Sequence, residues 1–237
     1  MRFDLGTDRD AGLAAAQDAL SRGALVVVPT DTVYGVAADA LQPQAVQRLL
    51  DAKQRGRELP PPVLIAESAV LRALVVDVPV EVDALINRFW PGALTVIMKA
   101  QPTLKMDLGE SEGTIAVRVP DQADTRELLR QTGPLAVSSA NLSGQPPATS
   151  IDDAIAQLGD SVAVYLDAGP APGPVPSTII DLTGSGGGRI LRSGLLSFAE
   201  LSAVLPGLTE DSGTKPAGSV QAAGQERGSE TERPPDA

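Results

Sequence analysis

The chain has 237 residues, of which 43% are hydrophobic and 21% are charged, so it is long and apolar enough to fold around a packed core. It contains no cysteine and no histidine, which excludes disulfides, thiolate or imidazole metal ligands, a cysteine nucleophile and a Ser-His-Asp triad. A net charge of −11 and an aromatic content of 3% argue against a basic or base-stacking nucleic-acid surface. Because no apolar run reaches the roughly 20 residues of a membrane span and no signal-peptide pattern opens the chain, we expect a cytoplasmic protein with no membrane attachment.

The first predicted element is a helix near the N-terminus. Thr7 and Asp10 resemble a capping box, and the apolar residues from Leu13 to Leu20 share one helical face. The continuous apolar run 24–28 then predicts a strand that is buried on both faces. The remaining segments predict helices that end near Lys53, surround Leu128 and begin at Ser150 and Ser197, and strands at 63–65, 94–98, 114–119, 135–137, 162–166, 177–181 and 189–192.

The order of these elements is mixed rather than a strict strand-helix-strand repeat. We therefore expect one α/β domain over residues 1–206, with a twisted mixed β-sheet flanked by helices. Beyond it, residues 207–237 carry six acidic against three basic residues and almost no large apolar side chain. Such a segment cannot bury enough surface to offset its ordering entropy, so we expect a disordered acidic tail.

Two polar segments in the first third of the chain are candidates for ligand binding. Residues 29–35 (PTDTVYG) place Thr30, Asp31 and Thr32 at a strand exit, where α/β sheets bind ligands. The alternative is an ordinary turn held by local hydrogen bonds. Residues 53–57 (KQRGR) gather three cations around a glycine, which suits a polyanion such as a nucleotide triphosphate, whereas the alternative is a solvated helix end.

Two later segments repeat the pattern of polar groups beside strands. Arg118 belongs to the apolar strand 114–118, and if it is buried it needs either a ligand carboxylate or an internal acidic partner. Ser138, Ser139 and Asn141 follow a strand and are small enough to bond phosphate oxygens or a ribose, although a plain turn is the simpler interpretation.

A last pair of segments is equally ambiguous when taken alone. Ser177 begins one predicted strand. Arg192 ends another and is followed by Ser193 and Gly194, so it is either an anion contact or a solvated arginine at a strand end. The glycine-rich run 184–188 predicts a hairpin connection, since it lacks the spacing and the lysine of a P-loop.

Taken together and in this order, these segments resemble the YrdC family of threonylcarbamoyl-AMP synthases. The matching stretches, over about residues 8–205, are PTDTVYG, KQR as the family's Lys-x-Arg, FWPGALT, GTIAVRVP, SSAN as its Ser-x-Asn, VPSTIID and LRSG. The resemblance implies a short, single-domain form with a large concave cleft. It also implies a nucleotidyltransferase that condenses L-threonine, bicarbonate and ATP into threonylcarbamoyl-AMP and pyrophosphate. The partners that it implies are a downstream tRNA threonylcarbamoyl transferase, Mg²⁺ bound with ATP, and weakly bound tRNA.

The resemblance also assigns roles to individual residues. Threonine and bicarbonate would contact Thr32, Arg118, Val137 and Ser177. ATP would contact Lys53, Arg55, Thr114, Ser139, Asn141 and Arg192, with Lys53 and Arg55 acting in catalysis and no side chain acting as a metal ligand. The amine and the carboxylate of the substrates supply the reacting atoms, so catalysis would come from positioning and from cations that stabilise phosphoryl charge.

The chain departs from the family pattern after Lys-x-Arg. The family often has Asn-Pro-Leu and then a histidine, whereas this chain has Leu59-Pro60 and places Leu64 at the histidine position. We expect Arg57 to replace one of the two missing contacts. Two alternative functions follow: a paralogue that makes another carbamoyl-adenylate, and a non-catalytic module that binds structured RNA in the same cleft. The net charge of −11 disfavours the second.

Overall fold

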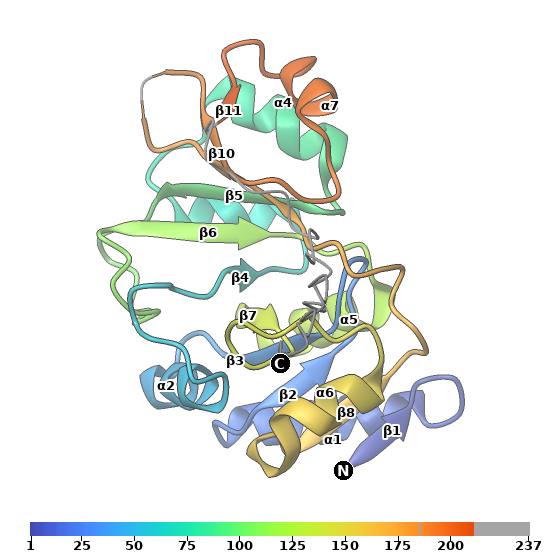
Figure 1. The fold of residues 1–237 in the computed structure, drawn as a ribbon. Helices are drawn as coiled ribbons and strands as arrows, with labels where there is room; N and C mark the ends of the chain where they lie inside the picture. Colours follow the sequence, from blue (N-terminus) through green and yellow to red (C-terminus); the bar gives the residue numbers. More distant parts are fainter. Residues whose placement is uncertain (185, 211–237) are drawn as a thin grey trace, which may run out of the picture.

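The computed structural model describes residues 1–184 and 186–210, which form one mixed β-sheet with helices on both faces (Figure 1). The strands are β1 (Arg2–Asp4), β2 (Val26–Val28), β3 (Gly35–Asp39), β4 (Val63–Leu64), β5 (Leu94–Lys99), β6 (Thr114–Arg118), β7 (Leu135–Ser139), β8 (Val164–Asp167), β9 (Thr178–Asp181), β10 (Arg189–Arg192) and β11 (Thr209–Glu210). Their order across the sheet is β1-β8-β2-β3-β7-β4-β6-β5-β9-β10-β11. Parallel and antiparallel pairs are both present, which confirms the predicted mixed sheet.

Most of the helices lie at the two ends of the sheet (Figure 1). The helices are α1 (Arg9–Ser21), α2 (Pro43–Ala52), α3 (Leu71–Leu74), α4 (Val80–Phe89), α5 (Ala123–Thr132), α6 (Ile151–Leu158) and α7 (Phe198–Ser202). In Figure 1, α4 and α7 lie with β10 and β11 at one end, and α1, α2 and α6 lie with β1, β2 and β8 at the other. No helix of the described residues is long and apolar enough to cross a membrane.

The strand β2 shows why the core forms on both faces of the sheet. Val26 and Val28 pack with α1, α5 and β8, while Val27 packs with α2 and α6 on the opposite face. All three side chains are fully buried, as the continuous apolar run predicted. Burying a valine or leucine side chain contributes about 1.5–3 kcal/mol, so these apolar layers stabilise the centre of the sheet.

Two of the three helix starts predicted at Thr7, Ser150 and Ser197 are confirmed, and both have a capping box. Ser150 caps α6 with Asp153, and Ser197 caps α7 with Glu200, each with both reciprocal hydrogen bonds. The third was wrong, because α1 begins one residue later than expected, with Asp8 as the N-cap residue. The hydroxyl of Thr7 donates to the Asp8 carboxylate instead of capping the helix.

The predicted boundary after Pro206 is too early. Leu208 is buried in the core, and Thr209 and Glu210 pair in parallel with β10. The folded domain therefore extends at least to Glu210, and the rest of the predicted tail lies outside the described residues. The sequence prediction also omitted β1, β3, β11, α3 and α4, and the last of these buries Val82, Leu85 and Ile86.

Candidate functional site

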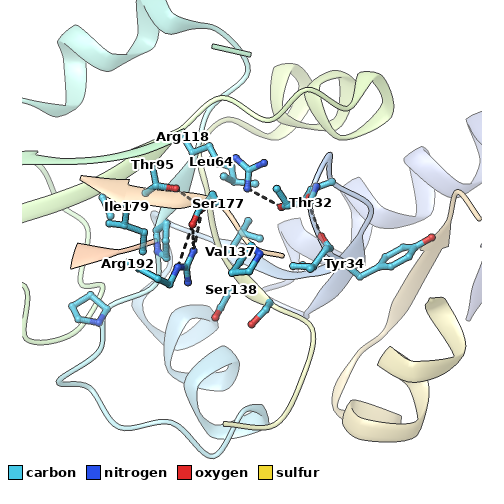
Figure 2. A pocket seen from close by; sticks show the side chains of 18 of the residues that line it. Thr32, Tyr34, Leu64, Thr95, Arg118, Val137, Ser138, Ser177, Ile179 and Arg192 are labelled. Atoms are coloured by element: carbon cyan, nitrogen blue, oxygen red, sulfur yellow. Dashed lines mark hydrogen bonds between the residues drawn. The ribbon is translucent and has the colours of Figure 1, made fainter. Parts of the chain in front are cut away.

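Polar side chains from separate parts of the chain meet in one cavity over the middle of the sheet (Figure 2). The strands β3, β7, β4, β6, β5, β9 and β10, which are consecutive neighbours in the sheet, all contribute to it. Seven of the residues predicted from the sequence line this cavity: Thr32, Arg55, Arg118, Val137, Ser139, Ser177 and Arg192. Of the described residues that line it, none carries a carboxylate, so its charge comes from three guanidinium groups.

Arg118 lies at the end of β6, where it is 6% exposed, and it has an internal partner. Its Nη2 donates to Asp31 Oδ1 at 2.6 Å, and its Nε donates to the carbonyl oxygen of Gly92 at 2.9 Å. Its Nη1 donates to Thr32 Oγ1 at 3.1 Å. Burial lowers the pKa of Arg118, and the Asp31 carboxylate opposes that change. Each terminal nitrogen carries a second N–H, so Arg118 can still bind a carboxylate with two donors.

Arg192 reaches the cavity because β10 carries a bulge. Ile190 pairs with Ile180, whereas Arg192 pairs with Ile179, so Leu191 is the extra residue. The Arg192 guanidinium donates to the carbonyl oxygen of Ser177 at 2.8 Å and to its hydroxyl at 3.1 Å. Burial lowers the pKa of Arg192 to about 10, and the like charges of Arg118 and Arg55 add to the effect. A bound anion would relieve this crowding of positive charge.

A glycine keeps this arrangement compact. Gly194 follows Arg192 and Ser193, and a Cβ atom placed on it would lie 2.4 Å from the carbonyl carbon of Ser177. Any larger residue there would push the segment 192–194 away from β9. This contact explains the glycine of the LRSG stretch as a packing requirement of the site.

Arg55 completes the set of cations from the loop after α2. Its Nη1 donates to Ser138 Oγ at 3.1 Å, and its Nε is buried and has no hydrogen-bond partner among the described residues. Burial lowers the pKa of Arg55, and Glu58 opposes that change. A buried donor without a protein partner, beside a cavity lined by cations and hydroxyls, is suited to an anionic ligand.

Three predicted residues lie outside this cavity. Lys53 is 2% exposed, and its Nζ donates to the carbonyl oxygens of Ser139 at 2.5 Å and Asn141 at 2.6 Å. Asn141 is also buried, and its Nδ2 donates to the carbonyl oxygens of Leu142 and Gln145, so its amide shapes the loop after β7. Thr114 donates to the carbonyl oxygen of Ser111 and lines a neighbouring depression that shares Pro60 and Ala116 with the main cavity.

The structure gives no support to the expected replacement by Arg57. Arg57 does not line the cavity but donates to Gln47 Oε1 at 3.0 Å and forms an ion pair with Asp107. Its charge is therefore used to join α2 to the loop that precedes β6. Leu64 does line the cavity, together with Val137, so the family's histidine position is here part of an apolar wall. Leu59 is 52% exposed and is not among the lining residues.

Thr95 and Thr30 line the cavity, although the resemblance gave neither of them a role. Thr95, on β5, is 1% exposed, and its hydroxyl lies 2.9 Å from that of Ser177. Thr30 lies beside Thr32 in the loop that the sequence predicted either as a ligand-binding loop or as an ordinary turn, and the resemblance gave it no role of its own. Thr95 ends the FWPGALT stretch, and that stretch was the one available signal for it. The hydroxyl of Tyr34, by contrast, points away from the cavity to the carbonyl oxygen of Gly169 (Figure 2).

Comparisons with known proteins find a matching family model, similar curated proteins and similar solved structures. The family model described as "Telomere recombination" (Sua5/YciO/YrdC) matches residues 18–194. A Mycobacterium tuberculosis protein named "Putative threonylcarbamoyl-AMP synthase" is 48% identical over 197 residues, which cover 83% of this chain and 90% of the relative. "Threonylcarbamoyl-AMP synthase" of Bacillus subtilis is 34% identical over 206 residues, which cover 86% of this chain and 59% of the relative. The structure described as "P. abyssi Sua5 complexed with L-threonine" is 32% identical, with a TM-score of 0.80 over 84% of this chain and 58% of that one.

Proposed function

The chain belongs to the Sua5/YciO/YrdC family, and we propose that it is a threonylcarbamoyl-AMP synthase. It condenses L-threonine, bicarbonate and ATP into threonylcarbamoyl-AMP and pyrophosphate. The observation that carries this proposal is the meeting of Arg55, Arg118 and Arg192 in one cavity without a carboxylate among its described lining residues. Three anionic reactants must be held together in this reaction, and three guanidinium groups supply the matching charge.

The reaction proceeds in two steps, and neither needs an imidazole or a thiol. The threonine amine attacks the carbon of bicarbonate and releases water, which leaves a carbamate. A carbamate oxygen then attacks the α-phosphorus of ATP, and pyrophosphate leaves. The protein contributes orientation of the reactants and positive charge around the phosphoryl group.

The two halves of the cavity suit different reactants. Arg118, Thr32, Val137 and Ser177 bind threonine and bicarbonate, since they combine a carboxylate receptor with hydroxyls and one apolar wall. Arg55, Ser139 and Arg192 bind the phosphates of ATP, and the nucleotide extends toward Thr114 in the adjoining depression. Lys53 and Asn141 act on ATP indirectly, through the loop that carries Ser139.

Magnesium enters as part of the MgATP substrate. Among the described residues, no group of three or more carboxylates or other ligands is placed to hold a metal ion. Phosphate oxygens and water would therefore be its main ligands. The product is consumed by a separate tRNA threonylcarbamoyl transferase, and contact with tRNA itself is weak because the chain carries a net charge of −11.

Pyrophosphate release tests the proposal. The purified protein should release pyrophosphate from MgATP only when L-threonine and bicarbonate are both present, and mass spectrometry should identify threonylcarbamoyl-AMP. The matched control is Arg72→Ala, which removes an exposed ion pair with Asp83 far from the cavity and should leave turnover unchanged. Pyrophosphate release with another amino acid in preference to threonine would favour the paralogue. Salt-sensitive tRNA binding without any turnover would favour the RNA-binding module.

A further inference from the structure

The hydroxyl of Thr30 uses all of its hydrogen-bonding capacity inside the protein. Its single proton goes to the carbonyl oxygen of Val33 at 2.6 Å, because a carbonyl can only accept. One lone pair accepts the backbone N–H of Thr32 at 3.2 Å. The remaining lone pair faces the Thr32 hydroxyl at 3.0 Å. In this contact Thr30 has no proton left to give, so Thr32 is the donor.

This assignment fixes the polarity of the Thr32 hydroxyl. Arg118 Nη1 is a donor and fills one lone pair of Thr32 Oγ1 at 3.1 Å (Figure 2). The Thr32 proton points to Thr30, as argued above. One lone pair of Thr32 Oγ1 is left, and Thr32 lines the cavity. Thr32 therefore presents an acceptor to a ligand and does not present a donor.

An acceptor beside Arg118 selects a particular part of an amino acid. Arg118 retains one free N–H on each terminal nitrogen for a carboxylate, and Thr32 lies next to that guanidinium. In an α-amino acid the nearest donor to the carboxylate is the α-amine, which is two bonds from the carboxyl carbon. The side-chain hydroxyl of threonine is one bond farther away.

We propose that Thr32 accepts a hydrogen bond from the α-amine of the amino-acid substrate, and that Thr30 is the positioning residue that holds the Thr32 hydroxyl in this acceptor orientation. The inference rests on the proposed function and adds to it the polarity of the contact and a role for Thr30. Its consequence is that the nitrogen that attacks bicarbonate is held by a hydroxyl whose proton is directed away from it. Both threonines are at least nine-tenths buried, so water does not compete strongly for these hydrogen bonds.

The test compares two ligands that differ in the amine. L-Threonine and 3-hydroxybutyrate share the carboxylate and the hydroxyl, but 3-hydroxybutyrate has no amine. Calorimetry should show that the wild-type protein binds threonine at least about tenfold more tightly, because a site built to bond an N–H rejects the analogue without it. The Thr32→Val variant should lose most of this preference. The Thr30→Val variant should lose at least about threefold of it, and Thr30→Ser should keep it because the hydroxyl is retained.

The ratio of two affinities measured on one sample does not depend on the fraction of protein that is folded. A merely structural defect in Thr30→Val would therefore leave the ratio unchanged, and that result would overturn the role of Thr30. A wild-type protein that binds both ligands equally, or a Thr32→Val variant that keeps the full preference, would overturn the acceptor assignment and leave the proposed function standing. A wild-type protein that binds neither ligand and releases no pyrophosphate would overturn both.

Discussion

The ammonium group of Lys53 lies 2.5 Å from the carbonyl oxygen of Ser139, behind the wall of the cavity and not inside it. A second carbonyl oxygen, that of Asn141, lies 2.6 Å away, and the N–H of Ser143 donates to the Lys53 carbonyl at 2.8 Å. Lys53 and Arg55, which belong to the same short stretch 53–57, therefore have different roles. Arg55 lines the cavity, and Lys53 binds the backbone of the loop that carries Ser139.

Replacing Lys53 by methionine should therefore weaken ATP binding through the loop. The KM for ATP should rise by about tenfold while the KM for threonine stays within about twofold, because only part of the population keeps the loop in its binding position. The unfolding free energy should fall by about 1–3 kcal/mol, since two buried carbonyl oxygens lose their donor. Steady-state kinetics and urea unfolding measure the two effects. A Lys53→Met protein of unchanged stability with a lower kcat at the same KM for ATP would instead indicate direct contact with the reacting phosphate.

Lys53 should also make stability depend on pH. Burial, with a smaller effect from Arg55, lowers the pKa of Lys53 to about 8 from an ordinary value of 10.5. Between these values the unfolded chain binds more protons at Lys53 than the folded chain does, so the contribution of this group to stability rises with pH. The difference in unfolding free energy between the wild type and Lys53→Met should shift toward the wild type from pH 8 to 10.5, by at most about 3 kcal/mol. A shift in the opposite direction would mean that the folded protein holds this proton more tightly than the unfolded chain.

The contrast between Lys53 and Arg118 shows what sequence patterns can and cannot predict. The apolar runs predicted β2, β5 and β6 with small errors at the ends, because burial on two faces leaves a direct trace in composition. The resemblance predicted which polar segments meet. Neither could predict that Lys53 bonds to carbonyl oxygens or that Arg118 pairs with Asp31, since those choices depend on loop geometry set by distant parts of the chain.

Thr95 and the bulge at Leu191 were missed for a related reason. An isolated threonine in an apolar strand carries no signal of its own, and its importance comes from Ser177, which lies far away in sequence and opposite it in space. The bulge is a break in pairing register, and no residue type encodes it uniquely. The weak strands β1 and β11 have two or three residues each, which is too short for a periodic pattern.

Substitutions of the two members of the Arg118–Asp31 ion pair should have different effects. Arg118→Ala should raise the KM for threonine by at least about tenfold, because the carboxylate receptor is lost. Asp31→Ala should destabilise the fold by about 3–5 kcal/mol, since it leaves a buried guanidinium without its counter-charge. Kinetics with threonine as the varied substrate and thermal unfolding separate the two. A larger effect of Arg118→Ala on ATP than on threonine would contradict the placement of the two halves of the cavity.

Arg57 provides the matched comparison for Arg55 in the same loop. Arg57→Ala removes an exposed ion pair with Asp107, so the KM for ATP should change by less than about twofold. Arg55→Ala removes a cation that lines the cavity, and the KM for ATP should rise by at least about tenfold. Both proteins are assayed with saturating threonine and bicarbonate. Equal losses in the two variants would show that Arg57 reaches the nucleotide, as the sequence alone had suggested.

Thr95 should set the direction of the Ser177 hydroxyl. Arg192 is a donor and fills one lone pair of Ser177 Oγ at 3.1 Å. If the Thr95 hydroxyl donates to the second lone pair of Ser177 Oγ at 2.9 Å, the Ser177 proton is free to bond an anion in the cavity. Ser177 would then offer a donor to the ligand, whereas Thr32 offers an acceptor. Thr95→Val should then raise the KM for threonine or bicarbonate by about fivefold, whereas Thr95→Ser should stay near the wild type.

A double-mutant cycle decides whether Thr95 acts through Ser177. Thr95→Val should have little further effect in a Ser177→Ala background, because the hydroxyl that it orients is already gone. The expected coupling is about 1 kcal/mol, within the range for residues in one hydrogen-bond network. Kinetics with threonine and bicarbonate varied separately give, for each substrate, the four KM values that the cycle needs. Additive effects of the two substitutions would mean that Thr95 contributes to the cavity by packing, and that Arg192 alone orients Ser177.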